Sequence, residues 1–131
     1  MKKKLLIIDD SPNIRKLITL AFSDKYDMLE AEDCASARRI ISGGTPDLIL
    51  LDFDLPDGDG VTFLKSARET GCVTPVIMLT AKDDLNVAGK AMDAGASGYV
   101  TKPFEMDKLA ELIEERMRPA SRDTYVPWRT E

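Results

Sequence analysis

The sequence contains no histidine and only two cysteines, and both facts narrow the chemistry open to the chain. Histidine is the commonest general base near neutral pH and the commonest ligand of transition metals, so sites that depend on imidazole are excluded. Cys34 and Cys72 lie far apart and form no Cys-x-x-Cys pair. We expect two reduced thiols, buried or half-buried, as in a cytosolic protein.

Long apolar runs and an excess of basic residues are also missing. No segment approaches membrane-spanning length, and the apolar run at residues 5–8 is too short for the hydrophobic part of a signal peptide. The formal net charge is -5 and the sequence pI is about 4.8, so the chain has no general electrostatic attraction to nucleic acid. We therefore expect a cytoplasmic protein that binds neither membranes nor nucleic acid directly.

What remains is the composition of a soluble globular protein. The 131 residues are 44% hydrophobic and 31% charged, which is enough for one domain with a single core. Short apolar segments and segments of helical periodicity alternate along the chain. Strands are predicted at residues 4–8, 26–31, 48–51, 75–80 and 97–100. Helices are predicted at 12–22, 35–42, 60–70, from 83 or 84 to 94, and 104–117.

The predicted strands are apolar on both faces, which favours a parallel sheet covered by helices on each side. With right-handed crossovers, alternating strands and helices give a doubly wound (βα)5 sandwich of the α/β class. Ser11 and Asp59 are predicted to cap the helices that follow them, and Gly71 lies just past the end of one. Gly89 lies inside the fourth helix, where glycine is about 1 kcal/mol less favourable than alanine. It either loosens this helix or allows close packing.

Polar side chains follow four of the five predicted strands. Asp9 and Asp10 follow the first strand, Asp52 the third, Thr80 closes the fourth, and Lys102 comes after the fifth. In a doubly wound sheet, ligands bind beyond the carboxyl ends of the strands. Each residue alone is typical of a turn, a cap or a solvated loop. Together at matching strand ends, they predict a functional site.

Four acidic residues lie in the segment LILLDFDLPDGDG, but only Asp52 lies at a strand end. Asp57 is assigned to a turn, and Asp59 to the helix cap. Three carboxylates close together cannot all stay ionised unless a cation joins them. Oxygen ligands without histidine or cysteine select Mg²⁺, or Mn²⁺ in its place. With an amine and a hydroxyl nearby, the set indicates phosphoryl transfer to a carboxylate nucleophile.

The sequence resembles the receiver domain of two-component response regulators, in the single-domain manner of chemotaxis-type regulators. The resemblance spans residues 3–118 and rests on IIDDS, LILLDFDLPDGDG, VIMLTA and GYVTKPF, in this order. It implies a flavodoxin-like fold with a five-stranded parallel sheet of order 2-1-3-4-5. Residues 1–118 would form the receiver domain and residues 119–131 a C-terminal tail or truncated linker.

The resemblance also implies a role for each site residue. Asp52 would accept a phosphoryl group from a phosphohistidine on a sensor histidine kinase or a phosphotransfer protein. Asp10, Asp52 and the backbone carbonyl of Asp54 would bind Mg²⁺ directly, and Asp9 would act mainly through a metal-bound water. Lys102 would pair with the phosphoryl oxygens.

A conformational switch is the further implication. Thr80 would hydrogen-bond to the phosphoryl group, and Tyr99 would change rotamer as Thr80 moves. The face formed by the fourth helix, fifth strand and fifth helix would then bind a downstream protein differently. The chain would catalyse only its own phosphorylation and slow dephosphorylation, as a monomer or a phosphorylation-dependent dimer. The Lys102–Pro103 peptide bond is expected to be cis.

An enzyme is the alternative. A strand ending in Asp52-Phe53-Asp54 also resembles the first motif of haloacid-dehalogenase-type Mg²⁺ phosphatases, with Asp52 as nucleophile and Asp54 as acid and base. In those enzymes the motif closes the first strand, and a later acid pair follows it. Here the motif closes the third predicted strand, and the pair Asp9-Asp10 precedes it.

Overall fold

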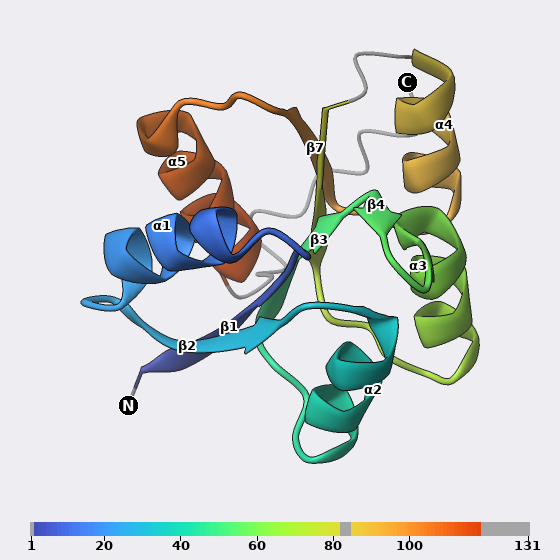
Figure 1. The fold of residues 1–131 in the computed structure, drawn as a ribbon, viewed down its shortest axis with the longest axis horizontal. Helices are drawn as coiled ribbons and strands as arrows, with labels where there is room; N and C mark the ends of the chain where they lie inside the picture. The colour runs from blue at the N-terminus through green and yellow to red at the C-terminus, as the bar shows by residue number, and fades with distance from the viewer. Residues whose placement is uncertain (1, 82–84, 119–131) are drawn as a thin grey trace, which may run out of the picture.

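A five-stranded parallel sheet forms the centre of the protein. The structure, a computed structural model, describes residues 2–81 and 85–118. The sheet strands are β1 (Lys3–Ile8), β2 (Tyr26–Ala31), β3 (Leu48–Asp52), β6 (Val76–Thr80) and β7 (Gly98–Thr101). Their order is β2-β1-β3-β6-β7, and every neighbouring pair is parallel (Figure 1).

Two further strands were not predicted. β4 (Asp54–Leu55) and β5 (Gly58–Asp59) pair antiparallel and form a small hairpin directly after β3. They belong to a separate two-stranded sheet. Among the strands of the main sheet, the order is therefore 2-1-3-4-5, and the predicted flavodoxin-like α/β fold is confirmed.

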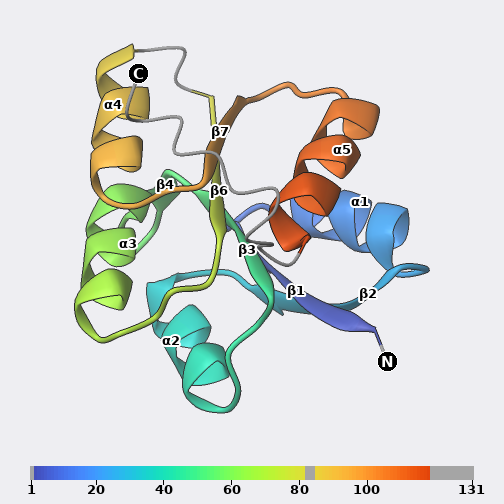
Figure 2. The ribbon, with the colours of Figure 1, turned by 180° about the vertical axis from the view of Figure 1, so that it is seen from behind.

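The helices cover both faces of the sheet. They are α1 (Pro12–Phe22), α2 (Cys34–Ser42), α3 (Gly60–Glu69), α4 (Leu85–Asp93) and α5 (Met106–Met117). Figures 1 and 2 show α1 and α5 on one face, and α2, α3 and α4 on the other. Alternate side chains of each strand pack into the two helical layers, which is the arrangement that strands apolar on both faces require.

The central strands show this double burial most clearly. In β1, Leu6 and Ile8 pack toward α2 and α3, while Leu5 and Ile7 pack toward α1 and α5, and all four are fully buried. The edge strand β2 is only partly buried, in line with its weaker apolar pattern. The predicted element ends agree to within one or two residues, except that the predicted start of the fourth helix lies outside the described residues.

Local capping explains where the helices begin. The Ser11 hydroxyl accepts the N–H of Ile14, with Pro12 as the first helical residue, and Asp59 accepts the N–H of Thr62, both as predicted. The second helix begins one residue earlier than predicted, because Asp33 caps it through the N–H of Ser36. Gly71 has φ of +96°, a backbone angle that favours glycine just past a helix end.

Asp57 does more than serve a turn. It lies between β4 and β5, but its carboxylate accepts the N–H groups of Cys34 and Ala35 at 2.8 and 3.1 Å. These bonds join the hairpin to the first turn of α2, and the hydrogen bond from Cys34 lowers the pKa of Asp57. The partners are more than twenty residues away in sequence, so a reading of local turn signals misses them.

The structure also bears on the predictions for the two cysteines and for membrane-spanning segments. Cys34 is buried, Cys72 is half-buried, and neither forms a disulfide, as predicted. Burial raises the pKa of the Cys34 thiol to about 11. Within residues 2–81 and 85–118, no helix has the length and apolar character needed to cross a membrane.

Gly89 lies in the middle of α4 and is exposed. A Cβ atom placed on it meets no neighbouring heavy atom within 4 Å. The alternative that this glycine allows close packing is therefore wrong. The alternative that its backbone freedom loosens α4 remains.

We expect Gly89→Ala to raise the free energy of unfolding by about 1 kcal/mol, because alanine has less backbone entropy to lose. Urea unfolding followed by circular dichroism measures this. Gly60→Ala is the matched control and should destabilise, since its Cβ would lie 2.5 Å from the Asp52 carbonyl oxygen. A Gly89→Ala variant no more stable than wild type would contradict the expectation.

Candidate functional site

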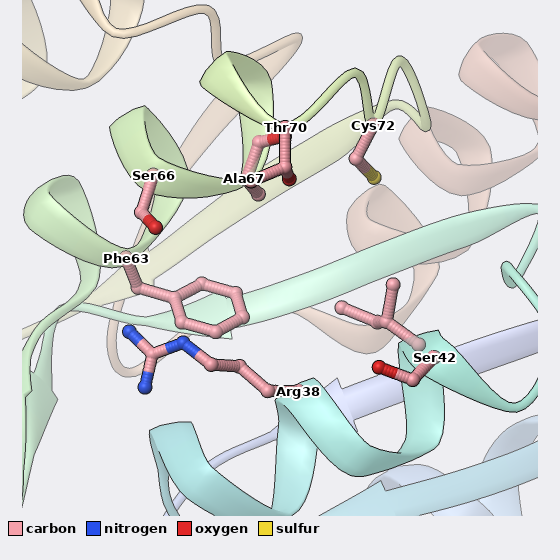
Figure 3. A pocket seen from close by; sticks show the side chains of 8 residues that line it. Arg38, Ser42, Phe63, Ser66, Ala67, Thr70 and Cys72 are labelled. Atoms are coloured by element: carbon pink, nitrogen blue, oxygen red, sulfur yellow. The ribbon is translucent and has the colours of Figure 1, made fainter.

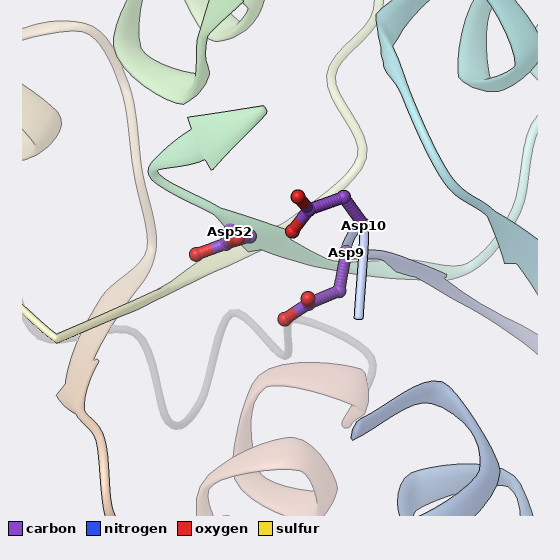
Figure 4. Close-up of side chains that lie close together, drawn as sticks. All are labelled: Asp9, Asp10 and Asp52. Atoms are coloured by element: carbon purple, nitrogen blue, oxygen red, sulfur yellow. The ribbon is translucent and has the colours of Figure 1, made fainter. Parts of the chain in front are cut away.

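Three carboxylates gather where β1 and β3 end. Asp9 and Asp10 directly follow β1, and Asp52 is the last residue of β3. One carboxylate oxygen of each lies within 4.8 Å of the others (Figure 4). Asp9 and Asp52 are buried, whereas Asp10 is exposed. The predicted convergence at the carboxyl ends of the strands is therefore present for the three acids.

Lys102 joins the two buried acids. It follows β7, and its Nζ lies 2.8 Å from Asp9 Oδ2 and 3.2 Å from Asp52 Oδ1. Its backbone N–H donates to the carbonyl oxygen of Thr80 at 2.7 Å. The next peptide bond, Lys102–Pro103, is cis. The Lys102 amine, which the sequence predicts to lie near the acids, thus bridges Asp9 and Asp52.

The charges of this cluster do not balance, since one ammonium faces three carboxylates. Burial of Asp52, and then the charge of Asp9, raise the pKa of Asp52 to about 6, although Lys102 opposes the shift. Burial alone would lower the pKa of Lys102, but hydrogen bonding to Asp9 and the charges of both acids outweigh burial and raise it. Lys102 therefore stays protonated at neutral pH, and the cluster keeps an excess of negative charge.

Asp9 and Asp10 differ in what their carboxylates can still bind. Asp9 is fully buried, and its Oδ1 accepts the N–H of Ser11 at 2.9 Å while its Oδ2 accepts Lys102. Both of its oxygens are therefore engaged. Asp10 is exposed to solvent, so it presents its carboxylate to the open side of the cluster.

The donor set fits a hard divalent cation. Oxygen atoms of three carboxylates, without nitrogen or sulfur, match the preference of Mg²⁺ and Mn²⁺. A divalent cation would also neutralise the excess negative charge. In the described part of the chain, Asp9, Asp10 and Asp52 form the group of acidic, histidine or cysteine side chains close enough to hold an ion together.

Thr80 and Tyr99 lie on neighbouring strands. Thr80 is the last residue of β6, is completely buried, and pairs with Thr101 of β7. Tyr99 pairs with Met78 and is half-buried on the edge strand β7, where it packs at the margin of the core layer that contains α2, α3 and α4. It also lines a groove of about 390 Å³ between β7 and α5.

The β4–β5 hairpin closes over the end of β3. The N–H of Gly60 donates to the carbonyl of Phe53 at 2.7 Å, and the N–H of Phe53 donates to Leu79 at 3.0 Å. Gly60 touches the Asp52 backbone so closely that no larger residue fits there without movement. Asp54, at the base of the hairpin, is exposed. The hydrogen bonds of Phe53 thus fix the backbone before Asp54, and the pairing of β4 with β5 fixes the backbone at and after it, while the Asp54 side chain is exposed.

One residue that contacts the site was not predicted from the sequence. Arg15 of α1 donates from Nη1 to the backbone carbonyl of Asp9 at 2.6 Å. The available signal was its position, one helical turn past Pro12 in the helix that directly follows the acid pair.

A separate cavity of about 290 Å³ lies between α2 and α3 (Figure 3). The guanidinium of Arg38 lies 5.4 Å above the ring of Phe63 at its wall, and Cys72 lies at its far end. Among residues 2–81 and 85–118, no carboxylate lines it, and none of its lining residues belongs to the acidic cluster.

Comparison with known proteins identifies the family. The model of the response regulator receiver domain matches residues 5–114. The chain belongs to this family. A receiver domain is typically a signalling module rather than an enzyme, and its acidic cluster is consistent with phosphorylation-dependent switching.

Similar proteins include longer regulators. The chain is 40% identical over 119 residues to the transcriptional regulatory protein DltR of Streptococcus agalactiae, covering 90% of this chain and 53% of DltR. It is 36% identical to the response regulator protein PilR of Pseudomonas aeruginosa, covering 89% of this chain and 26% of PilR. The chain thus spans about half of DltR and about a quarter of PilR.

Solved receiver structures have the same fold. A two-component response regulator from Clostridium difficile superposes with a TM-score of 0.86 at 26% identity, covering 95% of this chain and all of that one. The receiver domain of a Francisella response regulator gives 0.84 at 31% identity, covering 88% of this chain and 97% of that one.

The raised pKa of Asp52 makes stability depend on pH. The folded chain holds this proton more tightly than the unfolded chain, so the contribution of Asp52 to the free energy of unfolding falls as pH rises from about 4 to about 6. In metal-free buffer, Asp52→Asn should therefore be more stable than wild type at pH 7.5. We expect a gain on the order of 1 to 3 kcal/mol, since one unit of pKa shift corresponds to about 1.4 kcal/mol.

Urea unfolding in EDTA at pH 4 to 8 measures this difference. The gain should shrink as pH falls through 6 and vanish near pH 4, while contributions of groups that do not contact Asp52 cancel between the two proteins. A gain that is the same at every pH would contradict the burial of an ionised Asp52.

Proposed function

We propose that this chain is a phosphorylation-dependent signalling switch, in which Asp52 accepts a phosphoryl group from a phosphohistidine of a sensor histidine kinase or a phosphotransfer protein. One observation carries the proposal. Asp52, at the end of a central strand, lies in a cluster that holds two more carboxylates and an ammonium, and the cluster retains excess negative charge. Such a cluster suits a divalent cation, and the cation together with the Lys102 ammonium would offset the negative charge of an incoming phosphoryl group.

A carboxylate oxygen of Asp52 is the nucleophile. It forms a bond to phosphorus while the bond between phosphorus and the donor nitrogen breaks, and the imidazole leaves with that electron pair. The product is an acyl phosphate on Asp52. Bound Mg²⁺ would neutralise negative charge on the phosphoryl oxygens and on the acids. The Lys102 ammonium, whose Nζ lies 3.2 Å from Asp52 Oδ1, would pair with the transferred group.

Each remaining residue has a proposed part in binding. Asp10 and Asp52 would hold Mg²⁺ through their carboxylates, and Asp54 through its backbone carbonyl. Asp9 would act through a metal-bound water, since both of its oxygens already accept hydrogen bonds within the protein. The Thr80 hydroxyl would donate to a phosphoryl oxygen.

The switch would pass from Thr80 to the surface. The Thr80 carbonyl accepts the Lys102 N–H at 2.7 Å, so the ends of β6 and β7 move together. Phosphorylation adds about -1.5 to -2 charges at Asp52. Tyr99 would change rotamer in response, and the face of α4, β7 and α5 would bind a downstream protein differently. Slow autodephosphorylation would reset the switch, in a monomer or a phosphorylation-dependent dimer.

The receiver domain would comprise residues 1–118 and act in the cytoplasm. DltR is a transcriptional regulatory protein, and this chain corresponds to about half of it. We assign to the described residues only the phosphoryl acceptance and the change of surface, because the acidic balance of the chain gives no attraction to DNA. The downstream partner would therefore be a protein.

The test is incubation of the full chain with acetyl phosphate and Mg²⁺, read by intact mass. Wild type should gain about 80 Da, the mass of one phosphoryl group. Asp52→Asn should gain nothing. Asp59→Asn loses the same charge from the same segment but leaves Asp52 intact, so it should react like wild type.

Three outcomes would contradict the proposal. An adduct that also forms on Asp52→Asn would place the acceptor elsewhere. No adduct on wild type would contradict phosphoryl acceptance by this chain. Sustained turnover of small phosphate esters, lost in Asp52→Asn and Asp54→Asn alike, would favour the phosphatase alternative.

A further inference from the structure

A chain of hydrogen bonds behind the acid pair joins α1, β2 and the end of β1. Arg15 donates from Nη1 to the Asp9 carbonyl at 2.6 Å and from Nε to Glu30 Oε1 at 3.1 Å. Thr19, one turn later in α1, donates its hydroxyl to the other oxygen of Glu30 at 3.0 Å. Glu30 thus receives a hydrogen bond on each oxygen, and the guanidinium is held in one orientation between β1 and β2.

The position of Arg15 fixes the peptide that connects the two acids. The Asp9 carbonyl belongs to the peptide plane between Asp9 and Asp10, and this plane is rigid. On the other side of Asp9, its N–H donates to Ala31 of β2 at 3.0 Å. The two bonds together fix the backbone around Asp9. The orientation of the second plane in turn sets the direction in which the Asp10 side chain leaves the backbone.

Asp10 needs this support more than its neighbours do. The Asp9 side chain is held by Ser11 and Lys102, and Asp52 is held in a buried strand. Asp10 is exposed and follows the end of β1, so neither core packing nor a sheet pairing holds it. Its backbone orientation is therefore what directs its carboxylate toward the cluster.

The charge of Arg15 would have the opposite effect on a cation. A guanidinium near three carboxylates repels a divalent ion, although its pairing with Glu30 offsets part of that charge. Loss of the positive charge alone would tighten cation binding, whereas loss of the hydrogen bond to Asp9 would weaken it. The sign of the change therefore separates the two effects.

We propose that Arg15 is a positioning residue for the divalent-cation site, and that it acts by holding the peptide between Asp9 and Asp10. Thr19 and Glu30 hold Arg15 in turn. The inference rests on the proposed function, because it concerns Mg²⁺ binding at the same acids. Residues that orient metal ligands in this way typically change metal affinity by about 10-fold or more when they are replaced.

The experiment measures the Mg²⁺ dissociation constant of the full chain by calorimetric titration with MgCl₂. Arg15→Met should raise it by about 10-fold. Arg15→Lys keeps the charge and one donor, so its dissociation constant should lie between those of wild type and Arg15→Met. This partial rescue is not expected if only the packing of the aliphatic stem matters.

Lys16→Met is the matched control. Lys16 is the next residue of α1, is exposed, and loses the same charge when replaced. Its dissociation constant should stay the same or fall by about 2-fold, as loss of a nearby positive charge predicts. An equal weakening in Lys16→Met and Arg15→Met would overturn the proposal, because it would show that the hydrogen bond to Asp9 is not the cause.

A charge-neutral variant covers the case in which Arg15→Met fails to fold, judged by loss of a cooperative urea transition. Thr19→Val removes only the hydroxyl that holds Glu30, and should raise the dissociation constant by about 2-fold. Unchanged or tighter binding in Thr19→Val, or in folded Arg15→Met, overturns the inference alone. No Mg²⁺ binding by wild type overturns the proposed function, and the inference with it.

Discussion

Three carboxylates and one ammonium lie together at the carboxyl ends of β1, β3 and β7. The rest of the site depends on the excess of negative charge in this cluster. Asp9 and Asp52 are buried and share one ammonium, Lys102, and Asp10 lies beside them. Burial strengthens the repulsion between the Asp9 and Asp52 carboxylates, since little water screens it. The cluster therefore carries more negative than positive charge, and this excess fits the binding of a divalent cation.

The parallel sheet brings these charged side chains together. Parallel strands that are buried on both faces bring their carboxyl ends to one edge of the sheet, whatever residues follow them. What is specific to this chain is how the ends are joined. Lys102 links the buried acids, its N–H links β7 to Thr80, and Asp57 ties the hairpin after Asp52 to α2. Asp52 is thus linked to β7 and to α2 through covalent bonds and hydrogen bonds.

Prediction from the sequence was correct for the features that depend on local pattern. Continuous apolar strands predicted the sheet, and strand ends predicted that Asp9, Asp10 and Asp52 would meet, because both follow from short-range order and a general topology. It missed the β4–β5 hairpin, whose two-residue strands are too short for any periodicity. It also missed the contacts of Arg15 and Asp57, because their partners are backbone groups that carry no residue-specific signal.

The most direct test of this account is the pKa of Asp52, measured by NMR of its side-chain carboxyl carbon with and without Mg²⁺. The account predicts a pKa of about 6 in metal-free buffer, because burial and the charge of Asp9 disfavour ionisation. Saturating Mg²⁺ should lower it well below that value, since the cation favours the ionised form. A pKa near 4 without metal, or one that Mg²⁺ leaves unchanged, would contradict the central claim that unbalanced buried charge defines the site.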